Sequence, residues 1–186
     1  MMHFDHDTAR WLIVGLAVGV VRVFSGIQLY HYDFSHLGAA STIWYIAAYY
    51  SYVFFTVVVF PVVGGYWGQF DYIVRGHPGE TDSGSPRMKK ILVCTFIGCL
   101  AANIVLQVLL PDAQSPYPEG QPLMFFMTTA SSYWGAYGPM ATIADFIGTI
   151  LFTLVDPLEV AAFALVGATM TGLWMKTRHS KPDAPR

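Results

Sequence analysis

Charged residues are scarce in this chain. Only 12% of its 186 residues are Asp, Glu, Lys or Arg, whereas 54% are hydrophobic and 16% are aromatic. A soluble domain carries about a quarter charged residues, so this composition excludes an ordinary soluble domain. The net charge is -2 and no run of Lys or Arg occurs, so we expect no nucleic-acid partner. The sequence instead predicts a single all-α integral membrane domain over residues 1–186, with the lipid bilayer around it.

Cysteine is rare, and histidine is missing from the long apolar segments. Cys94 and Cys99 stand five positions apart in one segment, which places them on different sides of a helix, so we expect two separate buried thiols. Bis-histidine haem b needs imidazoles that face each other inside the membrane, and no segment supplies them. Haem b is therefore not expected, and the cofactor, if any, is unknown. The six histidines stand at positions 3, 6, 31, 36, 77 and 179.

The apolar runs predict a bundle of four to five transmembrane helices. A bilayer core about 30 Å thick requires ~20 apolar residues per helix. The predicted spans are 11–30, 42–64, 91–110, 139–155 and 157–176, and a short interfacial or re-entrant helix is expected at 123–137. The last span is predicted to start anew at "DPLE", with Asp156 as N-cap, Pro157 as the first helical residue and Glu159 as the capping-box partner.

Basic residues predict the orientation of these spans. The linker 65–90 contains Arg75, Arg87, Lys89 and Lys90, whereas the loops 31–41 and 111–122 contain neither Lys nor Arg. By the positive-inside rule the linker is cytoplasmic, and so are the N-terminus and the basic tail 177–186. Two cytoplasmic ends require an even number of crossings. We therefore expect four crossings, with 123–137 and 139–155 paired as one inserted unit; five true spans are the alternative. The expected location is a bacterial inner membrane.

Arg22 stands inside an otherwise apolar span and is predicted to pair within the bundle. An arginine at the centre of a membrane helix costs about 3 kcal/mol on insertion scales. Asp145 is the acid expected to pair with it, because Asp156 and Glu159 are accounted for as caps. Asn103 and Gln107 form a polar stripe at a similar depth. The sequence predicts one intramembrane polar cluster of Arg22, Asn103, Gln107 and Asp145; the alternatives are a purely structural cluster or an Arg22 that reaches the interface alone.

The loop "HYDFSH" offers a possible metal site. His31, Asp33 and His36 are imidazole and carboxylate groups of the kind that bind zinc, copper or iron. Their spacing fits no defined motif, so the prediction of a metalloenzyme site here is the least supported.

Three functions follow from these features. The chain has no Walker, GxSxG, HExxH or GxGxxG pattern, so we expect no catalytic activity of its own. The favoured function is a binding or packing subunit of a larger membrane complex. Small-residue helix faces at 15–19, 64–65 and 167–172 favour contact with other membrane subunits or self-association. The alternatives are a small oligomeric transporter or proton-coupled carrier that uses Arg22 and Asp145, and a metalloenzyme that uses the histidine loop.

Overall fold

The computed structural model describes residues 6–31, 35–75, 85–109 and 130–179. Every element in these ranges is helical, which agrees with the predicted all-α class. Four helices among them are long and apolar enough to cross a membrane: His6–Gly26, His36–Val74, Pro86–Leu106 and Leu154–Arg178. Their number matches the four-crossing prediction, although the last of these helices is placed differently from the expected spans.

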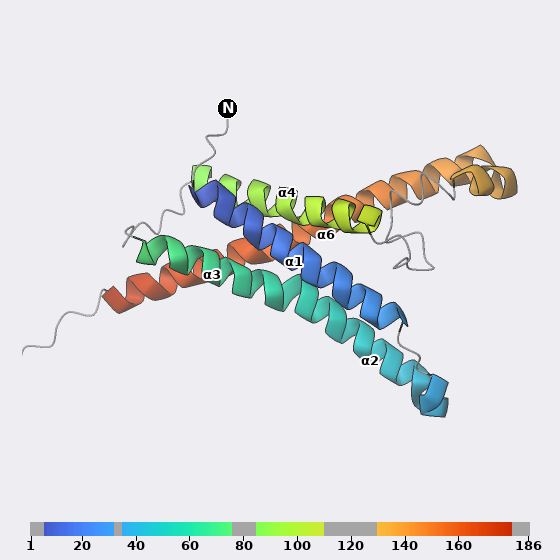
Figure 1. The fold of residues 1–186 in the computed structure, drawn as a ribbon, viewed down its shortest axis with the longest axis horizontal. Helices are drawn as coiled ribbons and strands as arrows, with labels where there is room; N and C mark the ends of the chain where they lie inside the picture. The colour runs from blue at the N-terminus through green and yellow to red at the C-terminus, as the bar shows by residue number, and fades with distance from the viewer. Residues whose placement is uncertain (1–5, 32–34, 76–84, 110–129, 180–186) are drawn as a thin grey trace, which may run out of the picture.

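The helices alternate in direction along the chain. Helix α1 and helix α4 run from left to right in Figure 1, whereas the α2–α3 helix and α6 run back, so the starts of α1 and α4 and the ends of α3 and α6 lie at the same end of the bundle. The bounds of the elements are α1 His6–His31, the 3-10 turn η1 Ser35–Ala40, α2 Ser41–Val53, the π-helical segment η2 Phe54–Val59, α3 Phe60–Val74, α4 Ser85–Leu109 and α6 Ala130–His179.

Glycines bring the helices into contact at the centre of the bundle. A Cβ on Gly15 of α1 would overlap the Thr95 carbonyl of α4, and a Cβ on Gly65 of α3 would overlap the Ala164 carbonyl of α6. A Cβ on Gly167 would likewise overlap the backbone of α3. In an apolar environment such close approach allows backbone-to-backbone packing that larger side chains prevent. The small-residue faces expected from the sequence therefore pack against helices of this same chain.

A small apolar core surrounds these contacts. Trp11 is completely buried and packs with Val14, Ile91, Cys94 and Ala168, while Val18, Cys99 and Val160 form a second cluster. Both cysteines are buried and free, as expected. The core therefore involves α1, α4 and α6, with α3 joined through its glycines.

Two predicted boundaries are wrong. The helix that was expected to end at residue 64 continues without interruption from Ser41 to Val74. Residues 65–74, the first part of the predicted linker 65–90, are therefore helical. The spans expected at 139–155 and 157–176 are parts of one helix, α6, and Pro157 does not start a new helix. In apolar surroundings an interrupted helix leaves several backbone groups unpaired, whereas proline removes only one hydrogen bond, so continuation is favoured.

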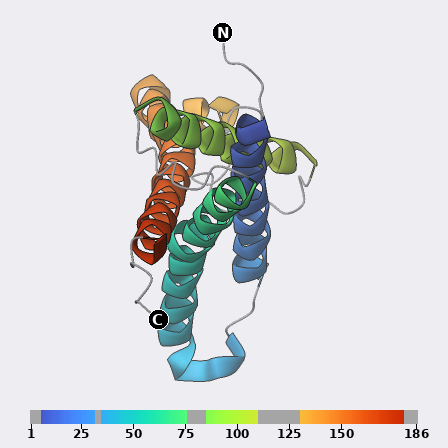
Figure 2. The same ribbon diagram turned by 90° about the vertical axis from the view of Figure 1, so that its left-hand side faces the viewer.

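The same correction applies to the expected interfacial helix at 123–137. Residues 130–137 belong to the first turns of α6, and residues 123–129 lie outside the described ranges. The long helices consequently extend past their shorter neighbours. The α2–α3 helix has 34 residues (Ser41–Val74) and α6 has 50, and in Figures 1 and 2 the segment α2 and the first part of α6 project beyond the bundle.

Candidate functional site

Arg22 pairs with an acid that sequence reasoning had assigned to another role. Its Nη2 atom lies 2.6 Å from Oδ2 of Asp156, and the two side chains are 13% and 38% exposed. The predicted N-cap role of Asp156 is therefore wrong: the residue lies inside α6 and binds a guanidinium of α1. The Asp145 side chain lies outside the described part of the structure. Asp145 precedes Asp156 by 11 positions on the same helix, which corresponds to about 16 Å along the axis.

The grouping of Asn103 with Arg22 stays a prediction, and the contacts between α1 and α4 support it. Helices α1 and α4 are parallel, and the approaches of Gly15 to Thr95 and of Gly19 to Cys99 and Ala102 fix their register. Continuing that register by one turn from Gly19 brings Arg22 level with Asn103. Arg22 Nη1 and Asn103 Oδ1 are both buried without a hydrogen-bond partner. The first atom is a donor and the second an acceptor, so each would be satisfied by a water or by a polar group of a ligand. The side chain of Gln107 is not among those described.

Tyr52 is a member of this site that sequence reasoning missed. Its hydroxyl donates to the backbone carbonyl of Arg22 over 3.4 Å, which connects α2 with α1. The π-helical segment η2 begins two residues later, and the Thr56 hydroxyl donates to the Tyr52 carbonyl at 2.7 Å. A π-helical turn disturbs the regular backbone ladder, and this hydroxyl bond provides the carbonyl with a partner. The only sequence signal was the excess of tyrosines in this segment over what an aromatic belt requires.

A second group of charges lies at the end of the bundle where both α1 and α4 begin. Arg10 of α1 is 5% exposed, and its Nη2 atom lies 2.8 Å from Oδ2 of Asp71 on α3. Arg75 contacts the other oxygen of Asp71 at 3.0 Å. Asp7 accepts a hydrogen bond from the Trp11 indole at 3.2 Å and lies 3.4 Å from Arg10. The carboxylate of Asp71 therefore joins the first turns of α1 to the last turns of α3, whereas Asp7 holds Arg10 and Trp11 within α1.

Helix α4 joins this end cluster through Arg87. Its guanidinium lies 3.6 Å from the centre of the Tyr72 ring, and its Nε atom lies 3.7 Å from Asp7. His6 completes the group, with Nε2 2.7 Å from Nη1 of Arg75. These contacts connect three helices where the basic residues gather, and the cation–π contact keeps part of the Arg87 charge against an aromatic face. Sequence reasoning missed the cluster because it treated the residues after 64 as a loop.

The predicted metal loop is mostly outside the described residues. Asp33 and the side chain of His31 belong to the part that is not described, and His36 is exposed on η1. Among the residues that the structure does describe, no group of three or more metal-ligating side chains occurs. The metal site built on His31, Asp33 and His36 therefore stays a prediction.

The ion pair of Arg22 and Asp156, with Tyr52 beside it and Asn103 on the neighbouring helix α4, is the candidate functional site. It combines a cation, an anion and two uncommitted hydrogen-bonding atoms inside apolar helices, a combination able to hold water, a small polar ligand or a proton. The end cluster contains more ion pairs and fixes three helices together, although Arg10 Nε and Arg87 Nε and Nη2 are also buried there without a hydrogen-bond partner. Comparison of the chain with protein-family models, with curated proteins and with solved structures finds no match.

Proposed function

We propose that this chain is a non-catalytic, four-span subunit of a larger membrane complex, with both ends on the cytoplasmic face of a bacterial inner membrane. Four helices with the required length and apolarity support the membrane location. The orientation follows from the basic residues at the shared end of the bundle, since Arg10, Arg75 and Arg87 all lie there.

Helix α2 is the observation that carries the proposal. None of its 13 residues is buried, although almost all are apolar or aromatic. Its exposed side chains include Ile43, Trp44, Tyr49 and Tyr50, and the Tyr50 side chain is 68% exposed. Aromatic residues with a hydroxyl or indole group are the side chains most enriched at the energetically dominant positions of protein interfaces. A helix of this composition is suited to contact with another protein.

Helix length argues in the same direction. A bilayer is about 40–45 Å thick with its headgroups. At 1.5 Å per residue the α2–α3 helix is about 51 Å long and α6 about 75 Å long. One or both therefore extend past the bilayer or bend strongly within it. The projecting parts are apolar, and outside the hydrocarbon such surfaces need cover from protein.

The surfaces available for a partner differ from those expected at first. The small-residue faces around Gly15, Gly65 and Gly167 are occupied by the chain's own helices. They cannot also mediate self-association without opening the bundle. A partner must therefore use the aromatic surface of α2 or the outward faces of the other helices.

The test compares the size of the native assembly for two variants. The chain would be extracted from its own membranes in a mild detergent and sized by native mass spectrometry, as wild type, as Trp44→Ala/Tyr50→Ala and as Ile13→Ala. Ile13 is an equally exposed residue on α1 (56%, like Trp44) and serves as the matched control. We expect a larger assembly for wild type and Ile13→Ala, and its loss in the α2 variant with an unchanged melting temperature. A wild-type chain that is always found alone would refute the proposal.

The unpaired atoms of the candidate site favour a second function, a proton-coupled carrier. It differs from the carrier predicted from the sequence in that Asp156, in place of Asp145, is the acid beside Arg22. The test is proton flux into proteoliposomes that contain a pH-sensitive dye. If the chain is a carrier, wild-type proteoliposomes should show proton flux and Asp156→Asn proteoliposomes should not. The absence of proton flux with the wild-type chain would exclude this function.

A further inference from the structure

Helix α6 has one buried face and one exposed face along the length of its predicted crossing. Between positions 154 and 174 the buried residues are at 157, 160, 161, 164, 167, 168, 171 and 172, and the exposed residues are at 154, 155, 158, 159, 162, 166, 169, 170, 173 and 174. This is the three-to-four-residue period of a helix that packs on one side only. Glu159 belongs to the exposed set, whose other members are apolar except for Thr169: Leu154, Val155, Leu158, Ala162, Val166, Met170, Leu173 and Trp174. A carboxyl group therefore points outward from an apolar surface.

Glu159 has no counter-charge within the described residues. The nearby acid of the same helix, Asp156, is bound to Arg22, which has no second short ion pair. From Val160 to Met175 the sequence carries no charge, and none occurs between Phe146 and Val155. An ionisable residue in a membrane helix is costly and almost always faces protein or a water-filled cavity, where it pairs with another group. The outward direction of Glu159 is thus unusual for a surface that would touch only lipid.

We propose that the outward face of α6 around Glu159 binds a transmembrane helix of another subunit, through a lysine or arginine of that helix at the depth of Glu159. This inference rests on the proposed subunit function and names the surface and the chemistry of the partner. The charge complementarity is specific: a cation is the only partner group that neutralises the carboxylate and donates to it as well.

A second copy of this chain does not fit the same surface. Copies in one membrane share an orientation, so α6 would meet α6 in parallel, with Glu159 near Glu159 of the other copy. The nearest basic residue of α6, Lys176, is 17 positions further along, which is about 25 Å in depth. Among the described helices, Arg22 is the only basic residue away from the end of the bundle where α1 and α4 begin, and it is already paired with Asp156. A different protein must therefore supply the cation.

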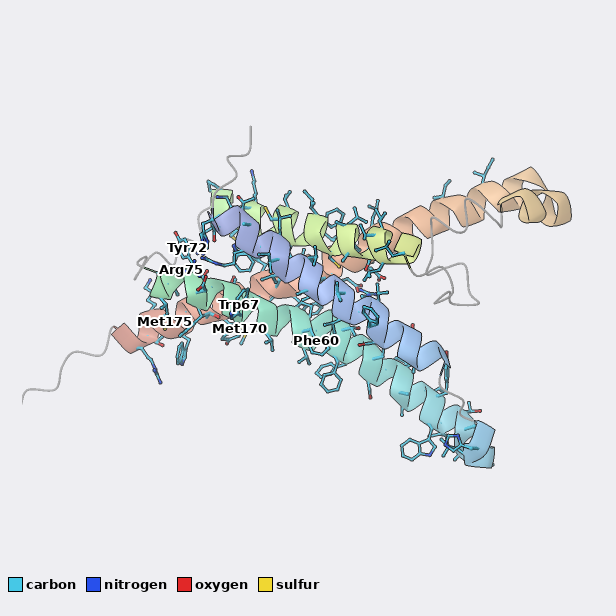
Figure 3. All side chains as sticks on the ribbon, viewed as in Figure 1. Phe60, Trp67, Tyr72, Arg75, Met170 and Met175 are labelled. Atoms are coloured by element: carbon cyan, nitrogen blue, oxygen red, sulfur yellow. The ribbon has the colours of Figure 1, made fainter. Side chains whose placement is uncertain are left out.

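Apolar surface further along α6 from Glu159 provides the rest of the contact. Helix α3 packs along α6, and both expose large side chains: Val63, Trp67 and Phe70 on α3, and Val166, Met170 and Leu173 on α6. Figure 3 shows Trp67 and Met170 on the stretch where α3 and α6 run together, and Phe60 further toward α2. Trp67 is 54% exposed, so an aromatic anchor is available for the partner helix to pack on.

The first experiment uses a synthetic leucine–alanine transmembrane helix as the probe. The helix carries one lysine at the depth of Glu159, and a control helix carries methionine there. Binding to the full chain in phosphatidylcholine vesicles is followed by energy transfer between labelled helix and labelled chain, for wild type, Glu159→Asp, Glu159→Gln and Ile97→Gln. Ile97 is an exposed residue of α4 and controls for the insertion of an amide.

We expect the lysine helix to bind the wild type about tenfold more tightly than Glu159→Gln, with Ile97→Gln like the wild type and Glu159→Asp retaining most of the preference. The methionine helix should not distinguish wild type from Glu159→Gln. Equal binding of the lysine helix to wild type and Glu159→Gln would overturn the proposal. Because Glu159 is exposed and has no ion pair among the described residues, an unchanged melting temperature of Glu159→Gln is expected.

The second experiment separates this inference from the subunit function itself. The native assembly is sized for Glu159→Gln beside the α2 variant Trp44→Ala/Tyr50→Ala. Loss of the assembly in Glu159→Gln supports the α6 surface. An assembly that survives Glu159→Gln but not the α2 variant overturns the α6 surface and leaves the subunit function standing. If the wild-type chain forms no larger assembly, both the subunit function and the α6 surface are refuted.

Discussion

The pair of Arg22 and Asp156 predicts an asymmetric response to its two single substitutions. Removal of one partner from a fully buried ion pair costs about 3–5 kcal/mol, because the other charge is left without a partner. The Arg22 side chain is 13% exposed and the Asp156 side chain 38%. Asp156→Asn leaves the more buried charge, the Arg22 guanidinium, without a partner, so we expect the free energy of unfolding to fall by about 3 kcal/mol. Arg22→Ala leaves the Asp156 carboxylate without a partner, and because solvent partly screens that charge we expect a loss of about 1–2 kcal/mol.

The double variant tests whether the two residues act together. Residues in direct contact show coupling energies of about 0.5–3 kcal/mol, whereas residues more than about 7–10 Å apart are additive within ~0.5 kcal/mol. We therefore expect Arg22→Ala/Asp156→Asn to cost about 1–2 kcal/mol less than the sum of its parts. The free energy of unfolding would be measured by reversible titration with dodecyl sulfate in mixed micelles, monitored by tryptophan fluorescence.

Asp145→Asn supplies the control, because the sequence had favoured Asp145 as the partner of Arg22. Asp145 stands 11 positions from Asp156, about 16 Å along α6, so its substitution should be additive with Arg22→Ala. Coupling of Arg22 to Asp145 and none to Asp156 would refute the assignment. It would also mean that α6 does not run straight through residue 156.

Two further predictions concern the packing and the charges of the bundle. Gly15→Ala should lower the free energy of unfolding by about 1–3 kcal/mol, because the new Cβ overlaps the Thr95 carbonyl, whereas Ala17→Val on the exposed side of α1 should change it by less than about 0.5 kcal/mol. Equal effects in the same titration would mean that α1 and α4 are not in backbone contact. Arg10→Ala should cost about 2 kcal/mol and Arg75→Ala at most ~0.5, because the two arginines share Asp71 but differ in exposure, 5% against 54%. The reverse order, measured by thermal unfolding at low salt, would exclude Arg10 as the buried link to α3.

The parts of the fold that followed from the sequence are those set by side-chain size and apolarity. Runs of apolar residues predicted the four long helices, because nothing else buries them. The Gly15–Gly19 pair predicted a face for close packing, because glycine alone lets backbones meet.

The parts of the fold that the sequence did not predict are those where a rule for helices in water was applied to a helix in apolar surroundings. The capping pattern at Asp156 describes a helix end in water, where solvent satisfies the broken backbone bonds. Inside an apolar bundle the continuous helix is favoured, and the carboxylate that would have capped it binds Arg22 instead. Asp71 was missed for a related reason. It belongs to the last turns of α3, where polar residues at the end of an apolar helix meet the basic residues of α1.

Charge balance connects the candidate site with the proposed partner surface. Apart from the charges at the end of the bundle where α1 and α4 begin, the described helices contain one basic residue, Arg22, and the acids Asp145, Asp156 and Glu159. Arg22 can neutralise only one of the three, and it binds Asp156. Burying the remaining carboxyls among apolar helices requires either a proton or a cation from outside the chain. A partner helix with a basic residue at the depth of Glu159 would supply that cation and remove the cost, so this excess of acid supports the proposal of a second protein.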